Sequence, residues 1–109
     1  MPTVIRVADH VRSAGTRGRG MRFFPTLKKA VKSAPLSARI VISFKDVEFV
    51  STSFLEETVL RLLVENTELG DRLTIEDLQP FVSERVRSKL SKMDKDPAIV
   101  SGARTLEPA

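Results

Sequence analysis

The chain has 109 residues, of which 41% are hydrophobic and 29% are charged, which is enough apolar material for one domain with one core. It contains no cysteine, which excludes disulfides, thiolate metal sites and thiol nucleophiles. The formal net charge is +4, and no run approaches the roughly 18 apolar residues of a membrane span. We therefore expect a cytoplasmic protein with no metal, no cofactor and no membrane span.

The charges are distributed unevenly along the chain. Residues 1–39 contain nine lysines and arginines and a single acid, Asp9, whereas residues 46–77 contain nine acids and only two arginines. Such opposed segments can attract each other within one fold, or they can present a basic face and an acidic face to two partners. Both interpretations remain open at the level of the sequence.

A strand, a loop and a helix are predicted first along the chain. The β-branched run at residues 4–7 predicts an edge strand, and the glycines of residues 14–20 predict a mobile surface loop. Helical spacing of the next apolar residues predicts a helix with Pro25 in its first turn and Pro35 just beyond its end.

Three arginines in and just after the glycine-rich stretch form a candidate anion-binding group. Arginine forks match phosphate oxygens, and glycines let backbone amides approach an anion closely. The alternative is a mobile basic loop without a ligand, because the stretch lacks the Gly-Lys-Ser/Thr end of a phosphate-binding loop. The three residues are Arg17, Arg19 and Arg22.

The remaining chain predicts two further strands and two further helices. The apolar run at residues 39–44 predicts a central strand, and residues 72–75 predict a third strand. Residues 54–66 predict an amphipathic helix, and Pro80 opens a last helix. The apolar positions expected on that last helix are Phe81, Val82, Val86 and Leu90.

Alternating strands and helices predict an α/β fold, a small mixed sheet with helices packed on it. We expect one domain over residues 1–93 and a flexible C-terminal tail over residues 94–109, in which Ile99 and Val100 are the residues able to dock.

A hydroxyl cluster separates the central strand from the following helix. Ser53 and Glu56 have the spacing of a capping box, with Ser53 as the N-cap and Glu56 as the N3 residue. Ser51 and Thr52 lie just before that cap. Because helix N-termini present unpaired amides and partial positive charge, this is the chemically distinctive place in the chain.

Residues 40–57 resemble the bacterial STAS-like proteins of unknown function, whose hallmark is a strand, a short loop ending in Ser-Phe and an acidic helix start. The glycine-bracketed Thr16-Arg17 is similar to the Ser/Thr-Arg that precedes the first helix of that family. Where the family commonly has an acidic residue late in the strand, this chain has Ser43. The likeness covers residues 4–92 and implies a STAS-like fold.

The segment is distantly similar to the STAS domains that antagonise anti-sigma factors, in which an ATP-dependent kinase phosphorylates a hydroxyl at a helix start. On their Asp-Ser-Ser/Thr-Gly-Leu pattern, Thr52 lies at the phosphoacceptor, Ser51 at the Asp, Ser53 at the second hydroxyl and Phe54 at the Gly. The resemblance therefore implies candidate phosphoacceptors at Thr52, Ser51 and Ser53. It also implies a partner-contact surface, formed by Thr52, Phe54, Glu56 and Glu57.

These patterns favour a non-enzymatic regulatory or protein-interaction module. Its partner would be an ATP-binding protein of the histidine-kinase-like or anti-sigma-like kind, and its mechanism would be partner switching. The alternative is a nucleic-acid-associated accessory protein that uses the basic first third. An enzyme is disfavoured because the only histidine, His10, has no nucleophile or second ligand at a recognisable spacing and is expected at the surface.

Overall fold

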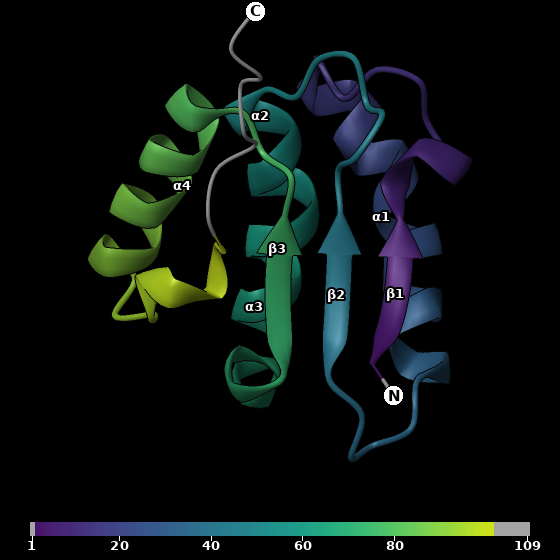
Figure 1. The fold of residues 1–109 in the computed structure, drawn as a ribbon, viewed down its shortest axis with the longest axis vertical. Coiled ribbons are helices and arrows are strands. Elements are labelled where there is room, and N and C mark those ends of the chain that lie inside the picture. Colours follow the sequence, from purple (N-terminus) through teal and green to yellow (C-terminus); the bar gives the residue numbers. More distant parts are fainter. Residues whose placement is uncertain (1, 102–109) are drawn as a thin grey trace, which may run out of the picture.

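The computed structural model describes residues 2–101 and has the expected α/β architecture (Figure 1). The strands are β1 (Thr3–Arg6), β2 (Ile40–Ser43) and β3 (Leu73–Glu76). The helices are α1 (Arg17–Ser33), α2 (Thr52–Leu55), a π-helical segment (Glu56–Leu60), α3 (Arg61–Glu65) and α4 (Pro80–Lys92). Short 3-10 turns cover Val7–Asp9, Thr67–Asp71 and Pro97–Ile99. No helix of residues 2–101 is long and apolar enough to cross a membrane.

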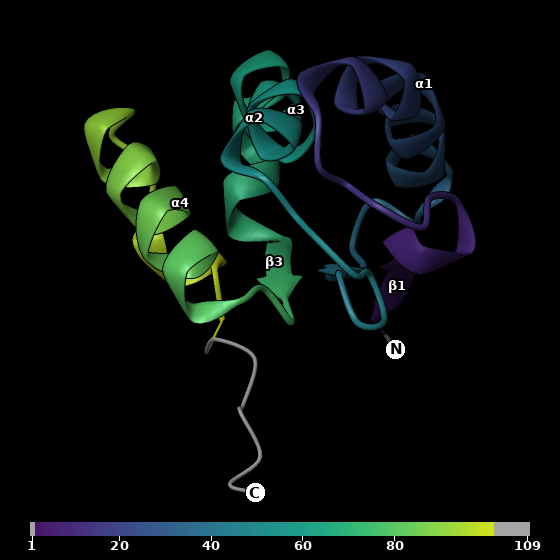
Figure 2. The same cartoon turned by 90° about the horizontal axis from the view of Figure 1, so that it is seen from above.

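The three strands form one sheet in the order β1-β2-β3, so the apolar run at β2 is the central strand, as predicted. Both pairings are parallel, with Ile5 opposite Ile42 and Ile42 opposite Ile75, whereas a mixed sheet was expected. Helices α1, α2 and α3 cover one face of the sheet, and α4 lies beside β3 (Figures 1 and 2). This topology brings the carboxyl ends of the strands to the same edge of the domain as the helix N-termini, the usual location of binding sites in parallel α/β sheets.

The first helix begins eight residues before Pro25, at Arg17, so the prediction of a mobile loop through Gly20 was wrong for residues 17–20. Thr16 is the N-cap, and its side chain accepts a hydrogen bond of 3.2 Å from the backbone amide of Arg19. This bond satisfies one of the free amides of the first turn and lets a glycine-rich segment start a helix. Pro25 consequently lies inside α1.

At Gly20, helix α1 comes close to the backbone of α2. A Cβ atom at this position would lie 2.9 Å from the carbonyl oxygen of Phe54 and 3.2 Å from its Cα atom. Those are backbone atoms that cannot rotate away, so only glycine allows the two helices to come this close. Gly20 is therefore required by helix packing, although its place among other glycines indicated a loop.

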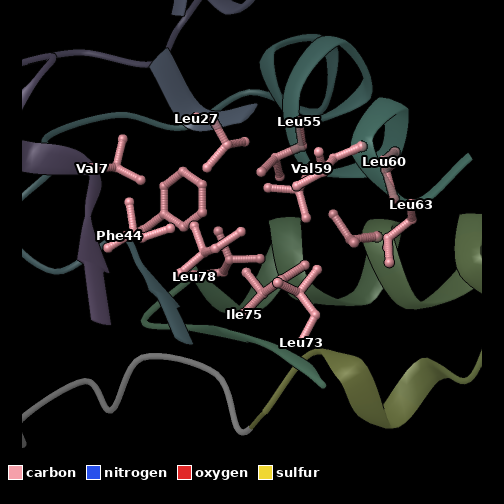
Figure 3. Packing of buried hydrophobic residues seen from close by; sticks show 14 of the residues in the cluster. Val7, Leu27, Phe44, Leu55, Val59, Leu60, Leu63, Leu73, Ile75 and Leu78 are labelled. Atoms are coloured by element: carbon pink, nitrogen blue, oxygen red, sulfur yellow. The ribbon is translucent and has the colours of Figure 1, made fainter. Parts of the chain in front are cut away.

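The core lies between the sheet and the helices on its covered face. Phe44, directly after β2, has no exposed surface, and Leu27, Leu55 and Leu78 belong to the same core at 0–1% exposure (Figure 3). Phe23 and Phe24 of α1 are 5% and 4% exposed, so both rings belong to this core. Burial of this kind contributes about 1.5–3 kcal/mol for each large apolar side chain.

Helical structure runs without interruption from Thr52 to Glu65, in agreement with the predicted helix, but its middle is a π-helix over Glu56–Leu60. Thr58 lies in this wider turn, is fully buried and donates its hydroxyl to the carbonyl oxygen of Phe54 at 2.9 Å. The bond satisfies a polar group that would otherwise be costly to bury. π-Helical turns of this type are frequent near functional sites.

The segment that follows α4 packs against the edge of the sheet. Ile99 and Val100 are only 5% and 3% exposed, and Val100 forms a parallel bridge with Ile75. The backbone amide of Ser101 donates to the carbonyl oxygen of Ile75 at 3.0 Å. The remainder of the predicted tail, residues 102–109, lies outside the described residues.

The basic first third and the acidic middle of the chain are joined by ion pairs, which supports the intramolecular interpretation of the charge asymmetry. Arg6 contacts Asp46 at 3.2 Å, and Lys28 contacts Glu65 at 3.1 Å. Hydrogen bonds from Lys28 and Arg61 lower the pKa of the Glu65 carboxyl. Since these groups are exposed, each pair adds little to stability.

We predict that Gly20→Ala destabilises the fold by about 1–3 kcal/mol, because the added methyl group forces α1 away from the backbone of Phe54. Gly18→Ala is the matched control. Its Cβ would meet only the end of the Arg22 side chain, at 3.9 Å. We expect it to be neutral or to stabilise the helix by up to about 1 kcal/mol. Urea unfolding of both variants measures the difference, and equal midpoints would contradict a close helix crossing at Gly20.

Candidate functional site

The loop that leads from β2 to α2 is fixed to the loop before α1 by backbone hydrogen bonds. The amide of Ala14 donates to the carbonyl oxygen of Phe49 at 2.7 Å, and the amide of Ser51 donates to the carbonyl oxygen of Ala14 at 2.9 Å. These bonds make a parallel bridge between Ala14 and Val50, both of which are buried. The hydroxyl cluster therefore begins at a position that the backbone defines.

Ser51, and not Ser53, is the N-cap of α2. Ser51 has extended backbone angles, φ −101° and ψ 156°, and its Oγ atom accepts a hydrogen bond of 3.0 Å from the amide of Phe54. The predicted capping box of Ser53 and Glu56 was therefore wrong by two residues. The reason is that three successive hydroxyl residues can all cap a helix, and the bridge to Ala14 places the extended residue at Ser51.

Thr52 and Ser53 occupy the first turn of α2 and are partly exposed. Together with Ser51 they line a recess of about 350 Å³ at the carboxyl edge of the sheet, between the loops that follow β2 and β3. The opposite wall comes from the start of α4, with Gln79, Phe81 and Arg85. The structure thus places all three candidate phosphoacceptors in one concave surface.

Two exposed phenylalanines line the same recess, and neither was predicted from the sequence as a surface residue. Phe49 is 54% exposed and Phe81 is 68% exposed, whereas Val82, Val86 and Leu90 on the other side of α4 are buried. Phe81 had been expected on the apolar side of α4, and that prediction was wrong. The sequence spacing indicates this difference. Residues 82, 86 and 90 are four positions apart and share one face of the helix, whereas residue 81 lies outside that series.

Both aromatic rings are held in place by neighbours in the structure. A Cβ atom on Gly15 would lie 2.9 Å from Cδ1 of Phe49, so the Phe49 ring rests on the Gly15 backbone. The guanidinium of Arg85 lies 4.5 Å from the centroid of the Phe81 ring, in a cation–π contact. We name the surface formed by Phe49, Ser51, Thr52, Ser53, Phe81 and Arg85 the aromatic–hydroxyl surface.

Phe54 does not belong to this surface. It is fully buried, its ring stacks on Phe23 at 5.9 Å between centroids, and it meets the edge of Phe44 at 6.4 Å. Its assignment to the partner-contact surface is corrected, because a buried ring offers a partner no side-chain surface. Its aromatic bulk instead anchors the start of α2 to the core.

Glu56 and Glu57 lie in the π-helical segment and are bound to neighbouring basic residues. Arg17 pairs with both carboxylates, and its Nη2 atom lies 3.6 Å from Glu56. The hydrogen bond that Arg17 donates to the Glu57 carboxylate raises the pKa of Arg17. Lys89 of α4 contacts Glu56 at 3.5 Å. The two acids therefore connect α1, the π-helical segment and α4 beside the aromatic–hydroxyl surface.

Ser43 at the end of β2 donates its hydroxyl to the carboxylate of Asp77 at 3.3 Å. Asp77 directly follows β3 and has a left-handed backbone, with φ 66°. A carboxylate thus reaches the late part of β2 from the neighbouring strand, although β2 itself has serine there.

The three candidate anion-binding arginines are not gathered at one place. Arg17 is paired with Glu56 and Glu57, whereas Arg19 and Arg22 line a separate recess with His10. His10 is exposed, as expected. Among residues 2–101, no group of three or more acidic, histidine or cysteine side chains could hold a metal ion.

The chain is structurally a small parallel α/β domain, and the capped start of α2 lies at the carboxyl edge of its sheet. The family described as the STAS-like domain of unknown function matches residues 19–82, which is more than half of the chain. The chain belongs to this family. Comparisons with curated proteins and with solved structures give no match.

We predict that Ser51→Ala lowers the free energy of unfolding by about 1 kcal/mol, because the amide of Phe54 loses its acceptor. Ser53→Ala is the matched control and should change stability by less than about 0.5 kcal/mol. Chemical denaturation of the two variants makes the comparison. A larger loss at Ser53 than at Ser51 would restore the cap to Ser53 and contradict the structure.

Proposed function

We propose that the chain is a non-enzymatic regulatory module that binds a protein partner through the aromatic–hydroxyl surface. The observation that carries the proposal is the exposure of Phe49 and Phe81 in the recess that Thr52 also lines. Large aromatic side chains are enriched at the centres of protein interfaces, where they supply much of the binding energy. Membership of the STAS-like family agrees with an interaction role.

The regulated group in this proposal is the hydroxyl of Thr52 or Ser53. Both lie partly exposed in the recess, whereas the Ser51 oxygen is engaged by the Phe54 amide at 3.0 Å. A phosphate would add about −1.5 to −2 charges beside the two aromatic rings and would change their fit to a partner. Arg85 is the basic residue among those that line the recess and is the candidate to receive that phosphate.

The partner class that fits this arrangement is an ATP-binding protein of the histidine-kinase-like or anti-sigma-like kind. Such a partner would phosphorylate the hydroxyl and then dissociate, which is the partner-switching mechanism. Glu56 and Glu57 do not oppose it strongly, because Arg17 and Lys89 neutralise their charge. Arg17, a basic residue of the first third of the chain, is occupied by these ion pairs. Because it is then less available to phosphates, nucleic acid is the less favoured partner.

We predict that Phe81→Ala weakens binding to the partner by at least about tenfold, as expected for an interface hot spot. Thr52→Glu should also weaken binding, by placing a negative charge beside the two rings. Leu36→Ala, at an 89% exposed site, and Lys29→Glu, on α1, are the controls and should change the affinity by less than about twofold.

The partner is first isolated by pull-down with the wild-type chain, and each variant is then titrated with it in a calorimeter. Circular dichroism confirms that the variants are folded. If Lys29→Glu abolishes binding while Phe81→Ala and Thr52→Glu leave it unchanged, the basic face of α1 carries the interaction and the proposal fails.

A further inference from the structure

A second concave site lies on the other side of α1 from its ion-paired residues. It has a volume of about 300 Å³ and is lined by His10, Val11, Arg19, Arg22, Phe23 and Thr26. Two separate parts of the chain form it, residues 10 and 11 just after the 3-10 turn Val7–Asp9, and residues 19–26 of α1. We propose that this recess binds a small phosphate-bearing anion, with Arg19, Arg22 and His10 as its ligands.

The two arginines share one face of α1 because they are three positions apart. The Nη1 atom of Arg22 lies 3.9 Å from the position that a Cβ atom on Gly18 would occupy, so its side chain extends back along the helix toward the turn of Arg19. Arg19 and Arg22 both line the recess.

Neither guanidinium is neutralised within the described part of the chain. The ion pairs found among residues 2–101 involve neither Arg19 nor Arg22. Asp9 is the single acid of residues 1–39, and its carboxylate contacts Arg6 at 3.8 Å. Unpaired arginines in a concave surface raise the local concentration of anions.

The other side of the recess is held in place and carries further donors. The amides of His10 and Val11 both donate to the carbonyl oxygen of Val7, at 2.9 and 3.0 Å. The His10 ring lies against the ring of Phe23, with centroids 5.6 Å apart. The Thr26 hydroxyl lines the same space. An imidazole and a hydroxyl can therefore donate to the anion that the two arginine forks hold.

Phosphate is the favoured oxyanion because arginine forks bind its tetrahedral oxygens in pairs. Among the lining residues the aromatic rings are those of His10 and the buried Phe23, and these two are already packed together. The recess thus offers no free aromatic platform for a nucleobase. The ligand class is an inorganic pyrophosphate or the terminal diphosphate of a small molecule.

The test is a calorimetric titration of the whole chain at low ionic strength with sodium pyrophosphate, ADP and adenosine. We expect pyrophosphate and ADP to bind and adenosine not to bind. The double variant Arg19→Gln/Arg22→Gln should weaken the binding of pyrophosphate and of ADP by at least about tenfold, since each substitution removes charge-assisted hydrogen bonds. The matched control, Lys29→Gln/Lys32→Gln, removes the same charge from the same helix outside the recess and should weaken binding by less than about threefold.

Amide chemical shifts recorded during the titration locate the ligand, and the variants' thermal unfolding confirms that they fold. Changes centred on residues 10, 11, 19, 22 and 26 support the recess. The proposal fails if pyrophosphate does not bind, or if adenosine alone binds. It also fails if the two double variants weaken binding equally, because that result would show a diffuse effect of net charge.

Discussion

The close crossing of α1 over the start of α2 is the constraint on which the rest of this edge depends. It requires Gly20, because the backbone of Phe54 lies where any larger residue would place its Cβ atom. The crossing brings Arg17 to Glu56 and Glu57, and it allows the Phe54 ring to stack on Phe23. Helix α2 is thereby held with its first turn facing the carboxyl edge of the sheet.

That position gives the hydroxyl residues their distinct roles. Ser51 is used to cap the helix, and Phe54 is used in the core, so Thr52 and Ser53 are the two residues between them that remain partly exposed. The start of α4 then supplies Phe81 and Arg85 across the recess. Ser51 and Phe54 therefore hold the start of α2 in place, whereas Thr52 and Ser53 are available to a partner.

Much of the fold could be predicted from the sequence because its strongest signals are local. The continuous apolar run at β2 predicted a central strand, and Pro80 predicted the start of α4, and both were confirmed. The start of α1 was missed because glycine has a low helix propensity, and only the tertiary contact at Gly20 explains its presence there. The cap was misplaced because Ser51 and Ser53 have equal capping ability, and the choice depends on a bridge to Ala14 from a distant part of the chain.

The sequence placed the candidate hydroxyls in one segment, but it did not predict the aromatic and basic residues that line the same recess. Its hydroxyls come from one segment, whereas Phe81 and Arg85 come from a helix that follows another strand, and parallel topology alone brings them together. Arg19 and Arg22 also lie apart from Arg17. They are three positions apart and line one recess, whereas Arg17 pairs with the acids of the π-helical segment.

The central claim is that a protein partner occupies the aromatic–hydroxyl surface. Hydrogen–deuterium exchange of the chain, alone and with its isolated partner, tests it most directly. The account predicts slower exchange at residues 49–53 and 79–85 in the complex, with little change along the exposed lysine side of α1. Protection confined to residues 28–32, with residues 49–53 and 79–85 unaffected, would contradict it.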